Sequence, residues 1–358
     1  MNFVWLDGES NSGKAHPNCS CGKKTVYYRA YNGESLCQDC FSSSIFEKTK
    51  KTISKYSMLN YGDRVGVAVS GGKDSTSLLY VMSEIMKGHG SKLYAITIDE
   101  GIKGYREESV RNAEKITEKL GIPLLVASYE DFFGFTLDEA LSERKEAESA
   151  HRKKITSCAM CGPLRRRSID MAAQKLGLDV VATAHNLDDV IQTFFINLYS
   201  GDLQRIRWLD PSLGNSKSGA RSASRFKLRR IKPFMEIYEQ ELAFFAYIND
   251  LPFQSESCPY MNEGIRTEIR ENLNTLEARH PGIKYSTLRT ILSIASSLRV
   301  AGSNSIPSAE ASQRRLQGKD SAKSCKVCGA VSSGEICSAC KTVELVSNWK
   351  VLNNIIEK

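Results

Sequence analysis

The feature that most constrains this chain is a strand, a glycine-rich turn and a helix in immediate succession. Residues 64–70 (RVGVAVS) are an apolar run typical of a buried strand, and residues 75–87 carry an apolar stripe at helical spacing. The segment that joins them reads Ser-Gly-Gly-Lys-Asp-Ser. Glycines let backbone N–H groups approach a phosphate closely, and a helix N-terminus adds partial positive charge. This order predicts a phosphate-binding loop, in which Lys73 neutralises phosphate and Ser70 and Ser75 donate to its oxygens.

Strands and helices alternate through the next hundred or so residues. Further strands are expected at 92–99, 123–129 and 179–185, and further helices at 105–120, 136–150, 162–176 and 187–199. The alternation is typical of an α/β fold with a doubly wound parallel sheet, in which ligands bind at the carboxyl ends of the strands. Residues 201–228 are polar, basic and rich in Gly and Ser, which indicates a mobile loop. An edge strand at 229–234 and helices near 238–250, 264–279 and 284–299 are expected to follow.

A second glycine-rich stretch, Gly8 to Ala15 (GESNSGKA), comes close to the Walker A pattern. Its last position is Ala15, which lacks the hydroxyl that binds Mg²⁺, and no strand precedes it. We therefore interpret it as part of a disordered end.

The bulk properties limit the possible partners. The 358 residues suffice for one sizeable domain with smaller satellites. No apolar run approaches the roughly 20 residues that span a bilayer, and the first residues do not resemble a signal peptide, so we expect a cytoplasmic protein without a membrane partner. The formal net charge is +8, with nine Lys or Arg against two acids between Asp202 and Lys232 and a second cluster at 165–167. These runs favour a polyanionic partner, although solvated surfaces also carry them.

Eight of the eleven cysteines fall into two groups of four. In a cytosolic chain such groups are more often metal sites than disulfides. The C-terminal group has the spacing of a structural zinc site and comprises Cys325, Cys328, Cys337 and Cys340. The N-terminal group comprises Cys19, Cys21, Cys37 and Cys40. Because it begins with CxC, either Cys19 reaches the metal through a local kink or His16 replaces it. Both modules are too small to fold on a hydrophobic core, so the metal would supply their stability.

Several motifs, in this order, resemble the archaeal and eukaryal tRNA 2-thiolation enzymes of the PP-loop, or N-type, ATP pyrophosphatase superfamily. The matching segments run from about residue 16 to 340 and are LCQDCF (36–41), SGGKDS (70–75), IDEGIKGYR (98–106), YEDFFG (129–134), SCAMCGPLRRR (157–167), AHNLDD (184–189), ESCPY (256–260) and the C-terminal CxxC pair. The resemblance implies an adenine nucleotide alpha hydrolase-like fold and adenylation with release of pyrophosphate. IDEGIKGYR, YEDFFG and the run Leu164-Arg165-Arg166-Arg167 are similar to the branch that thiolates the wobble uridine. The T-loop branch tends to end its first metal group with histidine, where this chain has Cys37 and Cys40.

The resemblance also implies roles for individual residues. Asp189 matches the active-site acid near ATP, and Arg165 matches a basic position that contacts phosphate or takes part in catalysis. Acids in a first helical turn are equally typical of capping. Ile98 is expected to face adenine through its backbone, and Ala184 stands where the family more often has glycine, which leaves less room for the nucleotide. The full set expected to bind ATP is Ala68, Val69, Ser70, Gly71, Gly72, Lys73, Asp74, Ser75, Ile98, Arg165, Ala184 and Asp189.

Three cysteines, Cys158, Cys161 and Cys258, belong to neither group of four. Three thiolates are one short of a closed tetrahedral site and suit a 4Fe–4S cluster with one open iron. The resemblance implies such a cluster, with the open iron able to hold a sulfide. A redox pair that carries a persulfide and a buried structural trio are the alternatives. Arg165 follows Cys161 by about one helical turn, so it can lie between the cluster and the nucleotide.

The expected activity is that of an ATP-dependent tRNA-uridine 2-sulfurtransferase. Transfer of AMP to the C2 oxygen of uracil creates a leaving group, Mg²⁺ and Lys73 stabilise pyrophosphate, and sulfur then displaces AMP. The expected catalytic residues are Asp189, Lys73, Arg165, Cys161 and Cys258. The resemblance implies a homodimer that binds tRNA and takes sulfur from a ubiquitin-like carrier protein or from free sulfide. The alternatives are thiolation of the T-loop uridine or of another tRNA base, and a non-enzymatic zinc-bearing RNA-binding protein.

The expected domain organisation follows the same motifs. It comprises a disordered end (1–15), an N-terminal zinc module (16–44), an ATP-binding α/β domain (45–235), a helical extension that carries Cys258 (236–300), a linker (301–324) and a C-terminal zinc module (325–345).

Overall fold

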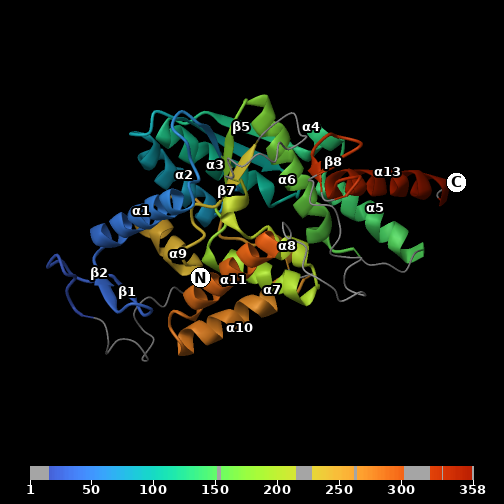
Figure 1. Cartoon of the computed structure of the whole chain (residues 1–358). Helices are drawn as coiled ribbons and strands as arrows, with labels where there is room; N and C mark the ends of the chain where they lie inside the picture. The colour runs from blue at the N-terminus through green and yellow to red at the C-terminus, as the bar shows by residue number, and fades with distance from the viewer. Residues whose placement is uncertain are drawn as a thin grey trace.

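Five parallel strands form the central sheet of the protein, which we describe from a computed structural model (Figure 1). The structure describes residues 16–150, 155–214, 228–261, 264–301, 323–332 and 334–356. In the order of the sheet, the strands are β5 (Leu124–Ser128), β4 (Lys92–Asp99), β3 (Arg64–Ala68), β6 (Val180–Ala182) and β7 (Arg229–Ile231). The chain starts at the central β3, proceeds outward to β5, and then returns to build the other side. This order confirms the doubly wound parallel sheet, with its topological switch point between β3 and β6.

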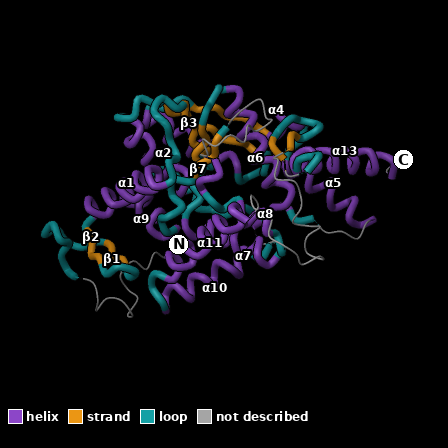
Figure 2. Tube along the Cα trace, in the orientation of Figure 1, coloured by secondary structure: helices purple, strands orange, loops and turns teal. Residues whose placement is uncertain are grey.

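The two faces of the sheet are covered by different helices, as Figures 1 and 2 show. Alternate strand residues point to opposite faces. In β4, Ala95 joins the hydrophobic cluster that contains Val65 and Val67 of β3, whereas Ile96 and Ile98 join the other cluster. The first cluster includes residues from α1 (Gln38–Lys55), α2 (Lys73–Met86), α3 (Arg106–Leu120), α7 (Leu187–Tyr199), α9 (Glu239–Ile248), α10 (Arg266–Arg279) and α11 (Ile283–Ala301). The second includes residues from α4 (Tyr129–Phe133), α5 (Leu137–Ala150), α6 (Ser157–Lys175) and α13 (Ser338–Ile356).

Several boundaries differ from the expected ones. Helix α6 begins at Ser157, not at 162, so Cys158 and Cys161 lie inside its first turns. The sequence of residues 45–60 predicts a helix that leads into the main domain; the observed helix, α1, begins earlier, at Gln38, and so includes Cys40. The expected loop at 201–228 holds α8 (Leu203–Arg207) and a 3₁₀ turn (Pro211–Gly214) in its described part. The expected disordered end (1–15) and almost all of the expected linker lie outside the described residues, as do residues 215–227.

Two small ribbons carry the cysteine groups of four. Strands β1 (Tyr27–Arg29) and β2 (Glu34–Leu36) pair beside the first group, and β8 (Lys323–Ser324) and β9 (Val331–Ser332) pair beside the second. Figure 1 shows the β1–β2 ribbon and the β8–α13 segment at opposite ends of the molecule. Helix α13, which the sequence analysis did not predict, packs on α5 and α6.

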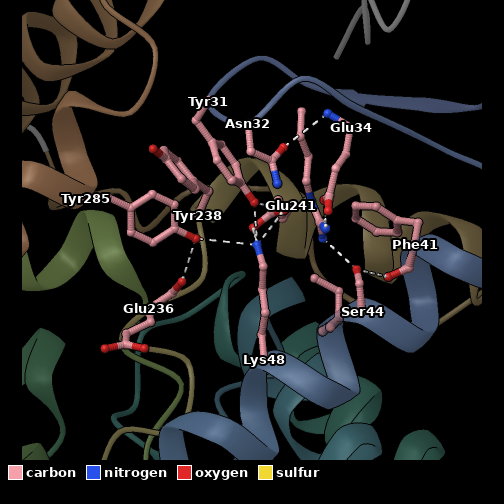
Figure 3. A network of polar contacts seen from close by, with 12 residues as sticks. Tyr31, Asn32, Glu34, Phe41, Ser44, Lys48, Glu236, Tyr238, Glu241 and Tyr285 are labelled. Carbon is pink, nitrogen blue, oxygen red and sulfur yellow. Dashed lines mark hydrogen bonds and ion pairs between the residues drawn. The ribbon is translucent and has the colours of Figure 1, made fainter. Parts of the chain in front are cut away.

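A buried polar network fixes the β1–β2 ribbon to the main domain (Figure 3). Arg29 and Glu241, the latter in the first turn of α9, form an ion pair of 2.6 Å with side chains 2% and 1% exposed. Tyr31 donates to the same carboxylate at 2.9 Å, and Lys48 of α1 lies 3.1 Å from it. The ribbon is thereby held against both α1 and α9.

None of the helices in the described residues combines the length and the apolar composition needed to cross a lipid bilayer.

Candidate active site and metal centres

The loop between β3 and α2 has the compact shape that the glycines predict. The backbone N–H of Ser70 donates to Ser75 Oγ at 3.0 Å, and this hydroxyl donates to the carbonyl of Gly72 at 2.9 Å. Gly71 has φ +79°, and a Cβ at this position would lie 2.2 Å from the backbone oxygen of Ser109 on α3. Only glycine therefore fits here. Gly72 has no side chain to cap α2, which leaves the first N–H groups of that helix open to an anion.

The residues that flank this loop take part in the backbone of the sheet. Val69, next to Ala68 at the end of β3, donates to the carbonyl of Ile96 at 2.8 Å. Ile98 lies near the end of β4, and its carbonyl accepts from Arg106. Ala184 follows β6 and is partly buried against the first hydrophobic cluster. The residues expected to bind ATP beside this loop therefore lie along the carboxyl edge of neighbouring strands.

Carboxylates surround the lysine of the loop. Lys73 Nζ lies 3.0 Å from Glu239 Oε1 and 3.4 Å from Asp74 Oδ2. Asn186, which follows β6, donates to Asp74 Oδ2 at 3.3 Å, so the segments on either side of the switch point meet. Burial, opposed by Lys73 and reinforced by Glu239 and Asp189, raises the pKa of Asp74 to about 7. Oδ1 of Asp74 is buried and has no hydrogen-bond partner among the described residues.

The two acids of the AHNLDD motif have different surroundings. Asp189 caps α7 in a reciprocal pair with Asn186, and its Oδ1 lies 3.6 Å from Arg266 of α10. Burial raises the pKa of Asp189, while the N–H of Asn186 and the charge of Arg266 oppose that rise. Asp188 is turned away into a buried ion pair with Lys284. The capping interpretation of Asp189 is confirmed, and its charge still reaches Asp74 in the nucleotide loop.

The three remaining cysteines share one region beside α6. Cys161 is buried, Cys158 is exposed, and Cys258 is partly buried in the loop before α10. The sulfur of Cys158 lies 4.0 Å from the carbonyl of Tyr260, two residues after Cys258. Burial raises the pKa of the Cys258 thiol; Arg165 lowers it, while Cys161 and Cys158 raise it further. The structure thus brings the three thiols within electrostatic reach of one another.

A cubane cluster fits this arrangement better than a single ion. Within the described residues, only the two groups of four have sulfurs that all lie within 4.8 Å of one another. Each cysteine of a 4Fe–4S cluster binds a different iron, so three cluster ligands need not approach as closely as four ligands of one ion. The Arg165 guanidinium, which donates from Nη2 to Cys161 Sγ at 3.4 Å, would offset the negative charge of thiolates. The Tyr129 hydroxyl lies 3.3 Å from the same sulfur.

One chain of contacts joins the nucleotide loop to these cysteines. Arg106 donates to the carbonyl of Ser70 at 3.0 Å, and its Nε lies 2.7 Å from Glu100 Oε2. The other oxygen, Oε1, lies 2.6 Å from Arg165 Nε. Arg165 in turn reaches the sulfur of Cys161. The expectation that Arg165 lies between the cysteines and the nucleotide loop agrees with these contacts.

Both groups of four cysteines have the geometry of a tetrahedral metal site. The four sulfurs of each group lie within 4.8 Å of one another, with 3.5 Å between Cys21 and Cys37 and 3.7 Å between Cys328 and Cys337. Zinc–sulfur bonds of about 2.3 Å imply sulfurs about 3.8 Å apart. The N–H groups of Cys21 and Cys37 lower the pKa of Cys19 to about 6. Cys19 therefore joins the N-terminal group as expected, and His16 is not part of it.

Positive charge gathers where β6 ends. The side chain of His185 is exposed to solvent at one side. Desolvation by the surrounding atoms and then the charges of Lys232, Arg266 and Arg166 lower its pKa. Arg229, within the basic run that favours a polyanionic partner, is mostly enclosed and pairs with Asp63, with the two side chains 12% and 10% exposed. Four of the nine basic residues between Asp202 and Lys232 lie outside the described residues: Lys217, Arg221, Arg225 and Lys227.

Several residues that complete the site were not expected from the sequence, among them Arg106, which contacts both Ser70 and Glu100. Glu239 and Arg266 come from helices far along the chain, so no local pattern connects them to the loop. Glu100 and Tyr129 stand directly after strands β4 and β5, at the edge where ligands bind. That position was the available signal.

Comparisons with known proteins identify the family. Residues 43–277 match the model of the PP-loop domain. The chain is 32% identical to the tRNA 2-thiolation protein NcsA of Haloferax volcanii over 91% of this chain and 98% of that protein. It is 34% identical to the cytoplasmic tRNA 2-thiolation protein 1 of Chlamydomonas reinhardtii over 90% of this chain and 82% of that protein.

A solved structure agrees with these relatives. The U34-tRNA thiolase NcsA from Methanococcus maripaludis, with its [4Fe-4S] cluster, superposes with a TM-score of 0.71 at 29% identity, over 92% of this chain and 96% of that chain. The fold and the relatives agree with the resemblance that the sequence indicated. The chain belongs to the PP-loop family and, within it, to the tRNA 2-thiolation proteins.

Proposed function

We propose that this protein is an ATP-dependent tRNA 2-thiouridine synthase that acts on the wobble uridine of the anticodon. The observation that carries the proposal is the chain of contacts from Ser70 through Arg106, Glu100 and Arg165 to Cys161. These contacts support the proposal, because a reaction that uses both ATP and sulfur requires a nucleotide loop close to the sulfur site. The relatives' names supply the substrate class, and the name of the solved relative supplies the wobble position, U34.

The first step would activate the C2 oxygen of uracil. This oxygen forms a bond to the α-phosphorus of ATP, the bond to the β-phosphate breaks, and pyrophosphate leaves. Lys73 and the open N–H groups of α2 would bind the phosphates, and Mg²⁺ would arrive on the phosphate oxygens of ATP. Asp189 is the proposed acid beside ATP, and Arg266 orients its carboxylate.

The second step would replace AMP by sulfur at C2. Sulfide would form a bond to C2 while the bond from C2 to the adenylated oxygen breaks, and AMP leaves with that oxygen. Cys158, Cys161 and Cys258 would hold a 4Fe–4S cluster, whose chemistry when bound would be to present the delivered sulfide. Arg165 would hold the negative charge that develops between this region and the nucleotide phosphate, since it stays a cation beside Glu100. Zinc in the two groups of four would stabilise the terminal modules without taking part in the chemistry.

The partners follow from the same proposal. The cationic groups around His185, together with Arg165 to Arg167, would bind the tRNA backbone. A ubiquitin-like carrier protein or free sulfide would deliver the sulfur to a homodimeric enzyme. The name of the Chlamydomonas relative favours a location in the cytoplasm.

A reconstitution experiment tests the function. Anaerobically prepared protein with its metals is mixed with ATP, Mg²⁺, sulfide and an unmodified tRNA transcript, and nucleosides and pyrophosphate are quantified. We expect 2-thiouridine at the wobble position and pyrophosphate that depends on tRNA. Lys73→Ala should abolish both, and Lys87→Ala, at the exposed position directly after the same helix, should change neither.

The other outcomes separate the alternatives. Formation of 2-thiouridine in the T-loop would mean that the same chemistry acts on the T-loop uridine instead of the wobble uridine. Binding of tRNA without release of pyrophosphate would favour the non-enzymatic RNA-binding protein and overturn the proposal.

A further inference from the structure

Glu100 is a buried carboxylate held between two arginines. Its side chain is 3% exposed and follows β4 directly. Its backbone is fixed as well, because its carbonyl accepts from the N–H of Leu137 at 2.7 Å. Oε1 lies 2.6 Å from Arg165 Nε, and Oε2 lies 2.7 Å from Arg106 Nε. One rigid anion therefore sets the direction of two long side chains.

The two arginines differ in how much they depend on this anion. Arg106 is 6% exposed and also donates to the carbonyls of Ser70 and Ile98, so three backbone and side-chain groups hold it. Arg165 is 47% exposed, and in the described residues Glu100 is its only ion-pair partner. A half-exposed arginine without such a partner would explore many rotamers. Its approach to Cys161 Sγ at 3.4 Å therefore depends on Glu100.

We propose that Glu100 is a positioning residue that directs Arg165 onto the sulfur of Cys161 and, through Arg106, ties that contact to the nucleotide loop. The inference rests on the proposed function, since it treats Cys161 as a cluster ligand. Hydrogen bonds to cluster sulfurs help to set the reduction potential. A carboxylate that aims Arg165 therefore acts on the cluster without touching it.

The test measures the reduction potential of the reconstituted cluster by anaerobic titration, without tRNA. Glu100→Asp keeps the charge but shortens the side chain, so it cannot reach both arginines. We expect a shift to lower potential, because the sulfur loses a donor. Arg165→Gln should also shift the potential. The double variant should match Arg165→Gln alone, because the effect of Glu100 passes through Arg165.

Controls separate this role from general stability. Glu108→Asp, at an exposed position in the first turn of α3, should leave the potential unchanged. A merely structural Glu100 would lower the unfolding temperature and leave the potential of the folded fraction as in the wild type. Arg165→Lys keeps the charge but cannot bridge Glu100 and Cys161, so it tests the same contact should Glu100→Asp not fold.

Each outcome has a distinct meaning. An unchanged potential in Glu100→Asp or in Arg165→Lys would overturn the inference, and so would a double variant in which the two shifts add. In another outcome, the wild type binds iron and the variants show the expected shifts in potential, while the wild type fails to thiolate tRNA. That result would contradict the proposed function but not the role of Glu100. A wild-type protein that binds no cluster would contradict both.

Discussion

Lys73 of the nucleotide loop is paired with Glu239 of α9, with 3.0 Å between Nζ and Oε1. The Lys73 charge lowers the pKa of Glu239 although burial alone would raise it, so the carboxylate is ionised. ATP phosphates would compete with this carboxylate for the same ammonium group. Because Glu239 occupies the Lys73 ammonium group before ATP binds, we expect the pair to oppose nucleotide binding.

Glu239→Gln should therefore bind ATP more tightly. A partly exposed ion pair contributes about 1 kcal/mol or less, so the Kd should fall by up to about fivefold. Isothermal titration calorimetry with Mg-ATP measures the change. Glu236→Gln is the matched control, because Glu236 pairs with Lys55 instead. Weaker binding in Glu239→Gln would mean that the carboxylate assists the nucleotide.

The raised pKa of Asp74, about 7, predicts a dependence of stability on pH. In the unfolded chain this carboxyl has its ordinary pKa near 4, so between the two values the folded protein binds more protons than the unfolded one. The free energy of unfolding should then fall as pH rises from about 4 to about 7. Asp74→Asn removes this contribution and should flatten the pH dependence of the protein without ATP.

Urea unfolding at pH 5.5 and 7.5 measures the difference between the Asp74→Asn variant and the wild type. Asp131→Asn is the control, because Ser128 lowers the pKa of that carboxyl and keeps it ionised across this window. A wild-type slope in Asp74→Asn would show that this residue does not titrate as its burial predicts.

How much of this site the sequence could predict depends on the range of the contacts. The loop at 70–75 and helix α7 follow from local signals: the glycines, the Asn186 cap and the apolar spacing. The expected start of α6, at 162, is five residues too late. Gly162 and Pro163 are typical of a helix start, but the N-cap is Thr156, whose side chain accepts from the N–H of Ala159.

Contacts between distant residues could not be predicted in the same way. Lys73 and Glu239 are 166 residues apart, and Arg29 and Glu241 are 212 residues apart. No periodicity relates such positions, because they meet only after the sheet has brought α9 against α2 and the β1–β2 ribbon. The cysteine groups are the exception, since ligand chemistry links residues that the chain separates.

The ion pair between Arg29 and Glu241 should dominate the attachment of the N-terminal ribbon (Figure 3). Glu241→Gln would leave Arg29 buried without its counter-charge and would also remove the partner of Lys48. Loss of one member of a buried pair costs about 3–5 kcal/mol. Chemical denaturation should show a fall of this size in the free energy of unfolding.

Glu34→Gln provides the matched control, because Glu34 is the second partner of Arg29 but is 50% exposed. An exposed pair contributes about 1 kcal/mol or less, so this variant should be nearly as stable as the wild type. Equal losses in the two variants would mean that burial does not govern the network.

Cys258→Ala should separate iron from zinc. Cys258 belongs to the three-cysteine set, whereas each proposed zinc site has its own four sulfurs. The variant should therefore lose cluster iron and thiolation activity while it keeps both zinc ions and binds ATP as the wild type does. Elemental analysis, ATP titration and tRNA thiolation under anaerobic conditions measure the four properties on the same preparation.

Cys337→Ala supplies the opposite pattern, since it breaks the C-terminal group of four. It should lose one zinc ion per chain and keep the iron. The persulfide alternative predicts a different result for the wild type, because thiolation would then continue after a chelator removes the iron. Full activity of iron-free protein would therefore reject the cluster, and loss of zinc in Cys258→Ala would mean that the metal sites are not independent.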